Sequence, residues 1–277
     1  MEQNPGISTR TIATRLGGNH SNSTVWQVLS EQLLYPYHVQ RVQALLPRDF
    51  PSRLQFCQWY YQEVNNNRNF NKTILFTDEA GFRRDGIVNY HNTHVWSDEN
   101  PHAFVQCRHQ EEFSLNVWMG IVGDNLIGPF FLPLRLNGES YLAFLQQELH
   151  ILLEEVPLNI RNQITFMHDG APPHFSIPVR THLNNTFGEN WIGRGGPIHW
   201  PPRSPDLNPI DFYLWGHLKT MVYATPIETI EELRNKIVNA CEEIRNRPRI
   251  LARVRRSMIR RVRRCTEMDG GHFQHLL

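Results

Sequence analysis

The proline-rich stretch from Trp200 to Trp215, with the sequence WPPRSPDLNPIDFYLW, constrains the fold more than any other part of the chain. Its first half excludes a helix or a central strand, because each proline lacks a backbone donor and fixes φ. Its second half has the composition of a helix start, with Asn208 as N-cap, Pro209 at the first helical position and Asp211 in the first turn. Asp211 is therefore expected at a fixed point near the positive end of a helix. The alternative is that Asp211 is only a capping acid.

Two further carboxylates follow short apolar segments with the composition of β-strands. Asp78 ends the segment KTILFTD and Asp169 ends the segment ITFMHD. Carboxylates at strand ends and at a helix start converge when they share one edge of a sheet. Mg²⁺ takes a few carboxylates and keeps its other positions for water and phosphate, and two such ions about 4 Å apart serve phosphodiester chemistry. The pattern makes Asp78, Asp169 and Asp211 candidate ligands of divalent cations.

Three motifs containing these acids, TDEAGF, HDGAPPH and SPDLNPIDFYLW, occur in this order along the chain. Together they resemble the acidic motifs of transposases of the mariner superfamily, which have an RNase H-like catalytic domain and a DDE/D triad. The resemblance implies that Asp78, Asp169 and Asp211 are the catalytic residues and metal ligands, with Mg²⁺ or Mn²⁺ as cofactor and two ions bound. Glu79 and Asp206 are neighbouring acids that the resemblance does not assign to the triad, and we expect them to be structural or to support the ligands.

The spacing of the second and third motifs departs from typical mariner elements. There are 41 residues between Asp169 and Asp211, a longer gap than is usual there. We expect residues 188–197, which contain the sequence IGRGG, to form a loop that accommodates the extra length. The longer gap affects the assignment of the chain to a subfamily more than it affects the expected chemistry.

Composition excludes several classes of protein. No apolar run reaches the length of about 18 residues that a transmembrane helix needs, so no membrane partner is expected. The first residues lack the basic and apolar regions of a signal peptide. The four cysteines are scattered without a CxxC pair, which argues against a zinc site or a disulfide framework and for a reducing compartment.

Charge is distributed unevenly, although the formal net charge is only +1. Residues 73–240 carry 19 acidic and 11 basic side chains, whereas residues 241–277 carry 10 basic and 4 acidic ones. An acidic middle with basic flanks suits a metal-dependent core whose flanks hold a polyanion. The alternative is a random charge distribution on solvated faces.

The sequence from Ser8 to Ser30 predicts two short helices separated by a glycine-containing turn. This pattern is typical of a helix-turn-helix, whose second helix reads the major groove from its N-terminal residues. The predicted DNA contacts are Asn22, Ser23, Thr24 and Gln27. Any helical pair has this pattern, but its position ahead of the motifs resembles a DNA-binding subdomain of the family. Arg41, in the connector that follows, is a further predicted phosphate contact.

The rest of the chain predicts a mixed α/β domain followed by a basic helix. Strands are expected at residues 73–77, 114–123 and 126–132, helices at 52–64, 140–155 and 178–187, and a strand at 198–200 before the helix of Asp211. Residues 245–264 contain ten arginines and no acid, with apolar residues at every fourth position. This predicts an amphipathic basic helix that contacts DNA phosphates through Arg255, Arg256 and Arg260, or that acts as a nuclear-targeting signal.

These patterns, together with the resemblance, predict an architecture and a function. The fold class is α/β, an RNase H-like mixed sheet with flanking helices, preceded by a small all-α helix-turn-helix domain. The expected segments are 1–47 for the DNA-reading domain, 48–245 for the catalytic domain and 246–277 for the basic helix and tail.

The resemblance implies a cut-and-paste DNA transposase that cleaves at terminal inverted repeats and joins the 3′ ends to target DNA. Its partner is double-stranded DNA, a homodimer would suit paired ends, no small-molecule substrate is expected, and the expected location is the nucleus. The family normally has two helix-turn-helix units, so the chain is expected to be shortened at its N-terminus. The alternatives are a transposase-derived DNA-binding protein without transposition activity and a metal-dependent nuclease without strand transfer.

Overall fold

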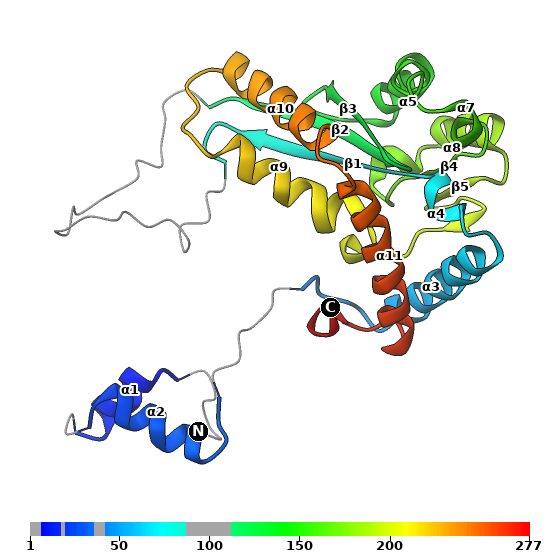
Figure 1. Cartoon of the computed structure of the whole chain (residues 1–277). Coiled ribbons are helices and arrows are strands. Elements are labelled where there is room, and N and C mark those ends of the chain that lie inside the picture. The colour runs from blue at the N-terminus through cyan, green and yellow to red at the C-terminus, as the bar shows by residue number, and fades with distance from the viewer. Residues whose placement is uncertain (1–6, 18–19, 36–41, 87–111) are drawn as a thin grey trace. The chain divides into compact units, whose positions relative to one another are not determined.

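The computed structural model describes residues 7–17, 20–35, 42–86 and 112–277 (Figure 1). The chain divides into two compact units, Met1–Arg41 and Val42–Leu277. Arg41, a predicted phosphate contact, lies outside the described residues. The sequence placed a boundary near residue 48 and a separate segment from residue 246, whereas the structure groups all residues from 42 onwards into one unit. The C-terminal helix belongs to that unit because it packs against the first helix of it.

The first unit contains a pair of helices, α1 (Thr9–Arg15) and α2 (Asn22–Glu31). Each begins at a serine whose side chain accepts a hydrogen bond from the backbone of the first turn, Ser8 for α1 and Ser21 for α2. The two helices pack through Ala13 and Val25, which are buried. The predicted helical pair is therefore present, with its second helix starting where the sequence indicated.

The second unit is built on a six-stranded sheet with the strand order β3-β2-β1-β4-β5-β6 (Figure 1). β1 pairs antiparallel with β2, and β2 with β3, whereas β4, β5 and β6 continue the sheet in parallel from β1. The predicted hairpin is confirmed, with Val122 opposite Asn125 across its turn. The strands are β1 (Ile74–Arg83), β2 (Ser114–Val122), β3 (Asn125–Leu132), β4 (Thr165–Met167), β5 (Trp191–Gly193) and β6 (Ile198–His199).

Two expectations about the strands were wrong. The segment 188–197 is not only a loop, because Trp191–Gly193 forms β5 and pairs in parallel with β4. Burial of Trp191 and Ile192 stabilises this short strand despite the glycines that follow it. In addition, β1 does not end before Asp78, because its pairing with β2 continues to Arg83.

Helices cover both faces of the sheet. The alternation of side chains along β1 places Ile74 and Phe76 in one hydrophobic cluster and Leu75 in the other. The first cluster includes α3 (Asp49–Asn66), α9 (Trp215–Val222), α10 (Ile230–Arg245) and α11 (Ile250–Glu267); the second includes α5 (Gly138–Gln147), α6 (Leu149–Leu152) and α8 (Ile177–Phe187). The single helix expected at residues 140–155 is instead two, α5 and α6. None of the helices in the described ranges is long and apolar enough to cross a bilayer.

The basic helix α11 is amphipathic as predicted. Its buried side is apolar and consists of Leu251, Val254, Met258, Val262 and Cys265. This side packs against α3, so the arginines of α11 lie on its flanks and on its outward side. The fold thus positions a basic helix against α3, in the hydrophobic cluster that covers one face of the sheet.

Candidate active site

Asp78 and Asp169 lie just beyond the parallel pairing of two central strands. The paired residues of β1 and β4 end with Phe76 opposite Met167. Asp78 and Asp169 each follow two residues later, and the Thr77 side chain donates a 2.7 Å hydrogen bond to the Met167 carbonyl at this point. The predicted convergence of these two acids at one edge of the parallel pair therefore follows from the strand register.

Asp211 reaches the same place on the segment that follows the proline-rich run. Asn208 is the anchor of this segment: its side-chain amide donates to the Thr77 carbonyl at 3.4 Å, and its side-chain oxygen accepts from the Ile210 N–H at 3.1 Å. Residues Ile210–Leu214 then form a π-helical turn that runs directly into α9. π-helical turns frequently occur at functional sites. Asn208 therefore does more than cap a helix, because it fixes the Asp211 turn to the strand that carries Asp78.

Trp215, the first residue of α9, completes the contact between this turn and β1. Its indole N–H donates a 2.7 Å hydrogen bond to Oδ2 of Asp78. The bond fixes the orientation of the Asp78 carboxyl, which is half-buried beside the helix. The geometry of the site thus depends on the Asp78 strand and the Asp211 turn being held together at this point.

Burial and neighbouring carboxylates raise the pKa values of Asp78 and Asp211. Burial, followed by the negative charge of Asp211, raises the pKa of Asp78 to about 8. Burial also raises the pKa of Asp211 to about 6, although hydrogen bonds from Asp78 and Asn208 oppose this shift. Asp211 retains a solvent-exposed side, so the surrounding protein desolvates it only in part. Two carboxylates that resist joint ionisation are the arrangement that a cation would stabilise.

Asp169 has a different environment, because a histidine neutralises it. Burial opposes ionisation of Asp169, but the hydrogen bond and positive charge of His174 outweigh that effect and lower its pKa. His174 Nδ1 lies 2.8 Å from Asp169 Oδ1, and the Ala171 N–H donates to the same oxygen at 2.9 Å. On its other side, His174 Nε2 lies 3.3 Å from Oε2 of Glu79. Burial alone would lower the pKa of His174, yet the Glu79 and Asp169 carboxylates raise it to about 10.

A stack of rings supports His174 from behind. The ring of His168 lies parallel to that of His174, with centroids 4.7 Å apart, and Tyr141 lies 4.2 Å from His174. Burial, and then the charge of His174, lower the pKa of His168 well below its ordinary value. A neutral His168 beside a charged His174 avoids two adjacent cations in the core. The motif around Asp169 therefore stabilises the ionised carboxylate, with His174 charged and His168 neutral.

The carboxylates fit a hard divalent cation by their chemistry. Asp78, Asp169 and Asp211 influence one another electrostatically and supply only oxygen donors, which Mg²⁺ and Mn²⁺ prefer. One oxygen of Glu79, Oε1, is buried without a hydrogen-bond partner beside them. In the described part of the chain, no group of three or more His, Cys, Asp or Glu side chains is close enough together to hold a metal ion as it stands. Instead, the Asp78 carboxyl interacts with that of Asp211, and the Asp169 carboxyl pairs with the His174 ring.

Sequence reasoning missed the link between Glu79 and His174, and the contact of Trp215 with Asp78. Both residues of each pair lie in the quoted motifs, but their spacing along the chain gives no sign that they touch. Asp206, in contrast, is structural as expected. It accepts two hydrogen bonds from the buried Arg53, at 2.8 and 2.7 Å.

The predicted DNA contacts of α2 lie on its surface. Asn22, Ser23, Thr24 and Gln27 are all exposed in its first turns. The hydroxyls of Ser23 and Thr24 lie 2.6 and 2.9 Å from the capping oxygen of Ser21. The four side chains therefore form one exposed polar surface at the start of the helix.

The three predicted contacts of α11 do not share one environment. Arg256 and Arg260 are exposed, but Arg255 is half-buried. The guanidinium of Arg255 forms an ion pair with Asp124 at 2.8 Å and also donates to the Gly123 carbonyl. Arg255 therefore anchors α11 to the β2–β3 turn.

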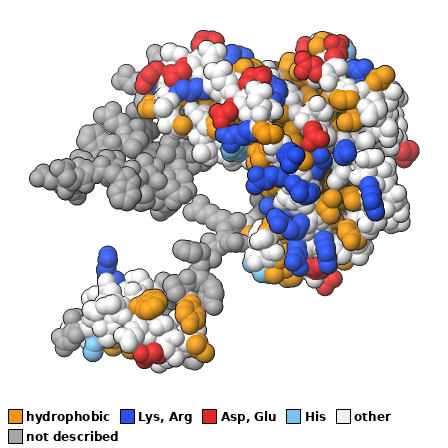
Figure 2. Space-filling view, viewed as in Figure 1, with side chains coloured by type: hydrophobic (Ala, Val, Ile, Leu, Met, Phe, Trp, Pro, Cys, Tyr) orange, Lys and Arg blue, Asp and Glu red, His pale blue; other side chains and the backbone are white. Residues whose placement is uncertain are grey.

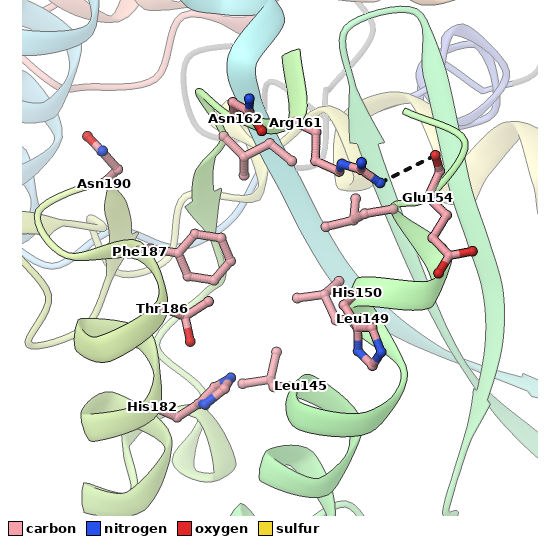
Figure 3. A pocket seen from close by; sticks show the side chains of 12 residues that line it. Leu145, Leu149, His150, Glu154, Arg161, Asn162, His182, Thr186, Phe187 and Asn190 are labelled. Carbon is pink, nitrogen blue, oxygen red and sulfur yellow. Dashed lines mark hydrogen bonds between the residues drawn. The ribbon is translucent and has the colours of Figure 1, made fainter. Parts of the chain in front are cut away.

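A groove on the opposite helical layer is separate from the carboxylates (Figure 3). It has a volume of about 530 Å³ and lies between α5–α6 and α8. His150 and His182 extend into it from opposite walls, and Arg161 donates to the Glu154 carbonyl at 3.5 Å at its edge (Figure 3). None of the three candidate catalytic acids lines this groove, so the groove is not the place of their chemistry.

Comparisons with known proteins found a matching family, similar sequences and similar solved structures. The family model for the DDE superfamily endonucleases matches residues 73–234 of the chain. The transposase of transposable element Tc3 from Caenorhabditis elegans is 27% identical over 242 residues, which cover 86% of this chain and 68% of that protein.

Solved structures of Mos1 transposase share the fold. Its paired-end complex with the left transposon end has a TM-score of 0.75 at 18% identity, covering 99% of this chain and 77% of that one. Its paired-end complex with Mg has a TM-score of 0.74, with the same identity and coverage. The expected fold class, a mixed α/β sheet with flanking helices and a preceding helical pair, is thereby confirmed.

Proposed function

The chain belongs to the DDE superfamily endonucleases, and from this premise we propose that it is a cut-and-paste DNA transposase of the mariner type. In this proposal it cleaves DNA at the terminal inverted repeats of its element and joins the freed 3′ ends to target DNA. The observation that carries the proposal is the approach of Asp78 on β1, Asp169 after β4 and Asp211 in the π-helical turn before α9, where burial and neighbouring carboxylates raise the pKa values of Asp78 and Asp211. The similarity to the Tc3 transposase supports the step from endonuclease to transposase.

We assign Asp78, Asp169 and Asp211 as the ligands of Mg²⁺ or Mn²⁺, with two ions bound. Bound divalent cations supply the activation of water and the stabilisation of the leaving oxygen in phosphodiester cleavage. Trp215 orients the Asp78 carboxyl, and His174 keeps Asp169 ionised and oriented. Asn208 fixes the Asp211 turn against β1. The exposed surface of Asn22, Ser23, Thr24 and Gln27 is the proposed reader of the repeat.

The proposal is tested by metal-dependent cleavage of a duplex carrying the inverted repeat that flanks the element's own coding sequence. Wild-type protein is expected to cleave with Mg²⁺ or Mn²⁺ and to be inactive in EDTA. Asp169→Ala should retain repeat binding and lose cleavage, by a factor of at least about 10³ given the size of such electrostatic effects. Cleavage that persists in Asp169→Ala would remove the triad from the mechanism.

A strand-transfer assay separates the proposal from its rivals. Joining of a precut repeat end to a supercoiled plasmid supports transposition. Cleavage without joining would indicate a nuclease, and repeat binding without cleavage would indicate a transposase-derived DNA-binding protein. We also place the protein in the nucleus, which the basic segment 245–264 supports. A homodimer is proposed because two ends must be joined in one event.

A further inference from the structure

The outward side of α11 carries arginines that have no acidic partner. Arg253, Arg256 and Arg260 are exposed and follow one another at helical spacing, opposite the apolar side that packs into the core. Within the described ranges, no carboxylate lies within 4.0 Å of any of the three guanidinium groups. Figure 2 shows lysine and arginine side chains gathered over this helix. Three adjacent like charges repel one another, so this surface favours an anionic partner.

The other arginines of the helix have different tasks. Arg255 pairs with Asp124. Arg261 lies 4.0 Å over the ring of Phe212 and donates to the Asp206 carbonyl at 3.3 Å. Arg263 and Arg264 pair with Glu267 of the same helix. Among the described residues, Arg253, Arg256 and Arg260 are thus the exposed arginines of α11 without an acidic partner.

A polar groove continues this surface towards α3. It has a volume of about 620 Å³ and is lined by exposed amides and a tyrosine of α3 and by the end of α11; its walls comprise Gln58, Tyr61, Gln62, Asn65, Asn66, Arg263, Thr266 and Glu267. Amide and hydroxyl groups of this kind supply many of the contacts that proteins make to phosphate and sugar. Glu267 is the one acid that lines the groove, and its carboxylate is engaged by Arg263 at 3.1 Å and Arg264 at 2.6 Å.

The helix that carries this surface also contacts the segment around Asp211. Arg261 contacts Phe212, the residue after Asp211, and the Asp206 carbonyl of the preceding turn. A linear polyanion bound along α11 would therefore pass near the carboxylates. A rod with one negative charge per about 1.7 Å, as in duplex DNA, fits a row of arginines better than a compact anion does.

We propose that this surface, formed by Arg253, Arg256, Arg260 and the groove between α3 and α11, binds the sugar-phosphate backbone of duplex DNA without regard to sequence. It is a second DNA-binding surface, on the catalytic unit, in addition to the helical pair at residues 9–31. The inference rests on the proposed function, because it takes DNA as the substrate. It differs from the set of contacts predicted from the sequence in including Arg253 in place of Arg255, whose guanidinium pairs with Asp124.

The test measures the salt dependence of binding to a 40-base-pair duplex that contains no inverted repeat. Full-length wild type is compared with Arg256→Gln/Arg260→Gln by fluorescence anisotropy from about 50 to 200 mM salt, the range over which phosphate contacts change affinity most visibly. Each lost phosphate contact reduces the slope of log K against log salt by about 0.9, so the double variant should lose about 2. The matched control is Arg135→Gln/Arg247→Gln, which removes two exposed arginines outside α11 and should leave the slope within about 0.5 of wild type.

Two further outcomes decide the inference. The same loss of slope on a repeat-containing duplex supports sequence-independent contact, whereas a loss confined to repeat DNA overturns it. Equal slopes for the α11 variant and wild type also overturn it and would leave an acidic protein as the partner of this surface. Cleavage plays no part in this readout, so a failure of the proposed catalytic function, seen with Asp169→Ala, remains distinguishable from a failure of the surface. Thermal unfolding of both double variants verifies that they are folded, since exposed substitutions shift stability by about 0.5 kcal/mol at most.

Discussion

Asp78 and Asp169 occupy equivalent positions beside each other, because each follows the last paired residues of β1 and β4 by two residues. Their supports differ. β1 continues past Asp78 and remains paired with β2, whereas β4 ends at Met167 and the chain turns so that His174 returns to Asp169 at 2.8 Å. The site therefore combines one carboxylate on a continuous strand with one held by its own loop. This difference explains why their pKa values shift in opposite directions.

Without divalent cations, the protein is expected to lose stability as the pH rises from about 4 to about 8. The pKa of Asp78 is 3.8 ordinarily and about 8 in the folded protein. Because folding raises this carboxyl pKa, its contribution to the free energy of unfolding is complete below pH 3.8 and is lost as the pH rises through the pKa of the folded state. After allowance for partial solvent screening, the loss is on the order of 3 kcal/mol. Thermal unfolding in EDTA at pH 5 and pH 8 measures it.

Asp78→Asn is the control for this pH effect. The amide still offers an oxygen to the Trp215 indole but cannot ionise. Its stability should vary less between pH 5 and pH 8 than that of wild type, and saturating Mg²⁺ should stabilise wild type more at pH 8 than at pH 5. A variant with the same pH dependence as wild type would show that Asp78 is not the titrating group.

His174→Gln is expected to destabilise the protein by about 3 kcal/mol at neutral pH, because it removes the cation between two carboxylates. The pKa of His174 is raised from 6.5 to about 10. Because folding raises this histidine pKa, the charged ring contributes fully to the free energy of unfolding below pH 6.5, and the contribution is lost as the pH rises through about 10. The difference between wild type and variant in urea denaturation should therefore shrink between pH 6.5 and pH 10.

The exposed His199 provides the matched control for this substitution. His199→Gln should change the free energy of unfolding by no more than about 0.5 kcal/mol. If the two histidine variants lose equal stability, or if the loss in His174→Gln does not depend on pH, the charged bridge between Glu79 and Asp169 is disproved.

The three candidate acids could be recognised in the sequence because each follows a local pattern, a short apolar strand or a proline-led helix start. The contacts that support these acids could not be recognised in the sequence. Arg53 lies 153 residues from Asp206, and Trp215 lies 137 residues from Asp78. Local composition carries no information about such pairs, since only the assembled sheet brings them together. Motif reasoning therefore identified the three acids and left the contacts that orient them undetermined.

The strand β5 shows a second reason why sequence patterns fail. Trp191–Gly193 has only three residues and stands next to glycines, so its composition indicates a loop. It forms a strand because it completes the sheet beside β4 and buries Trp191. Tertiary burial overrides local preference most easily in elements as short as this one.

Gly193→Ala should destabilise the protein by about 1–3 kcal/mol, because an added methyl group overpacks the core. A Cβ at this position would lie 2.6 Å from the His168 ring and 2.9 Å from Trp191. Gly81 offers a matched control in β1, since a Cβ there meets nothing within 4 Å. Chemical denaturation of both alanine variants measures the difference. Equal stability of the two would mean that the β5 backbone does not press against His168.

Arg53→Lys is expected to lower the free energy of unfolding by about 3–5 kcal/mol, because a lysine cannot reproduce the contacts of a buried guanidinium. The Arg53 side chain is 1% exposed. Besides Asp206, it donates to the Gly270 carbonyl at 2.7 Å and to the Ser204 hydroxyl at 2.9 Å. It thus joins α3 to the C-terminal segment and to the turn that leads to Asp211.

Arg263→Lys serves as the control, because its side chain is 68% exposed and pairs with Glu267 only at the surface. Its expected effect is about 0.5 kcal/mol or less. Urea denaturation midpoints compare the two variants, and cleavage is then assayed at a temperature at which both are folded. Because Arg53 holds the turn that precedes Asp211, Arg53→Lys should also lose cleavage under these conditions. Arg135→Lys, at an exposed arginine outside the proposed DNA-binding surface, should retain it. Full cleavage by a folded but destabilised Arg53→Lys would show that Arg53 contributes only to stability. In that case Asn208, and not Arg53, would be the residue that positions Asp211.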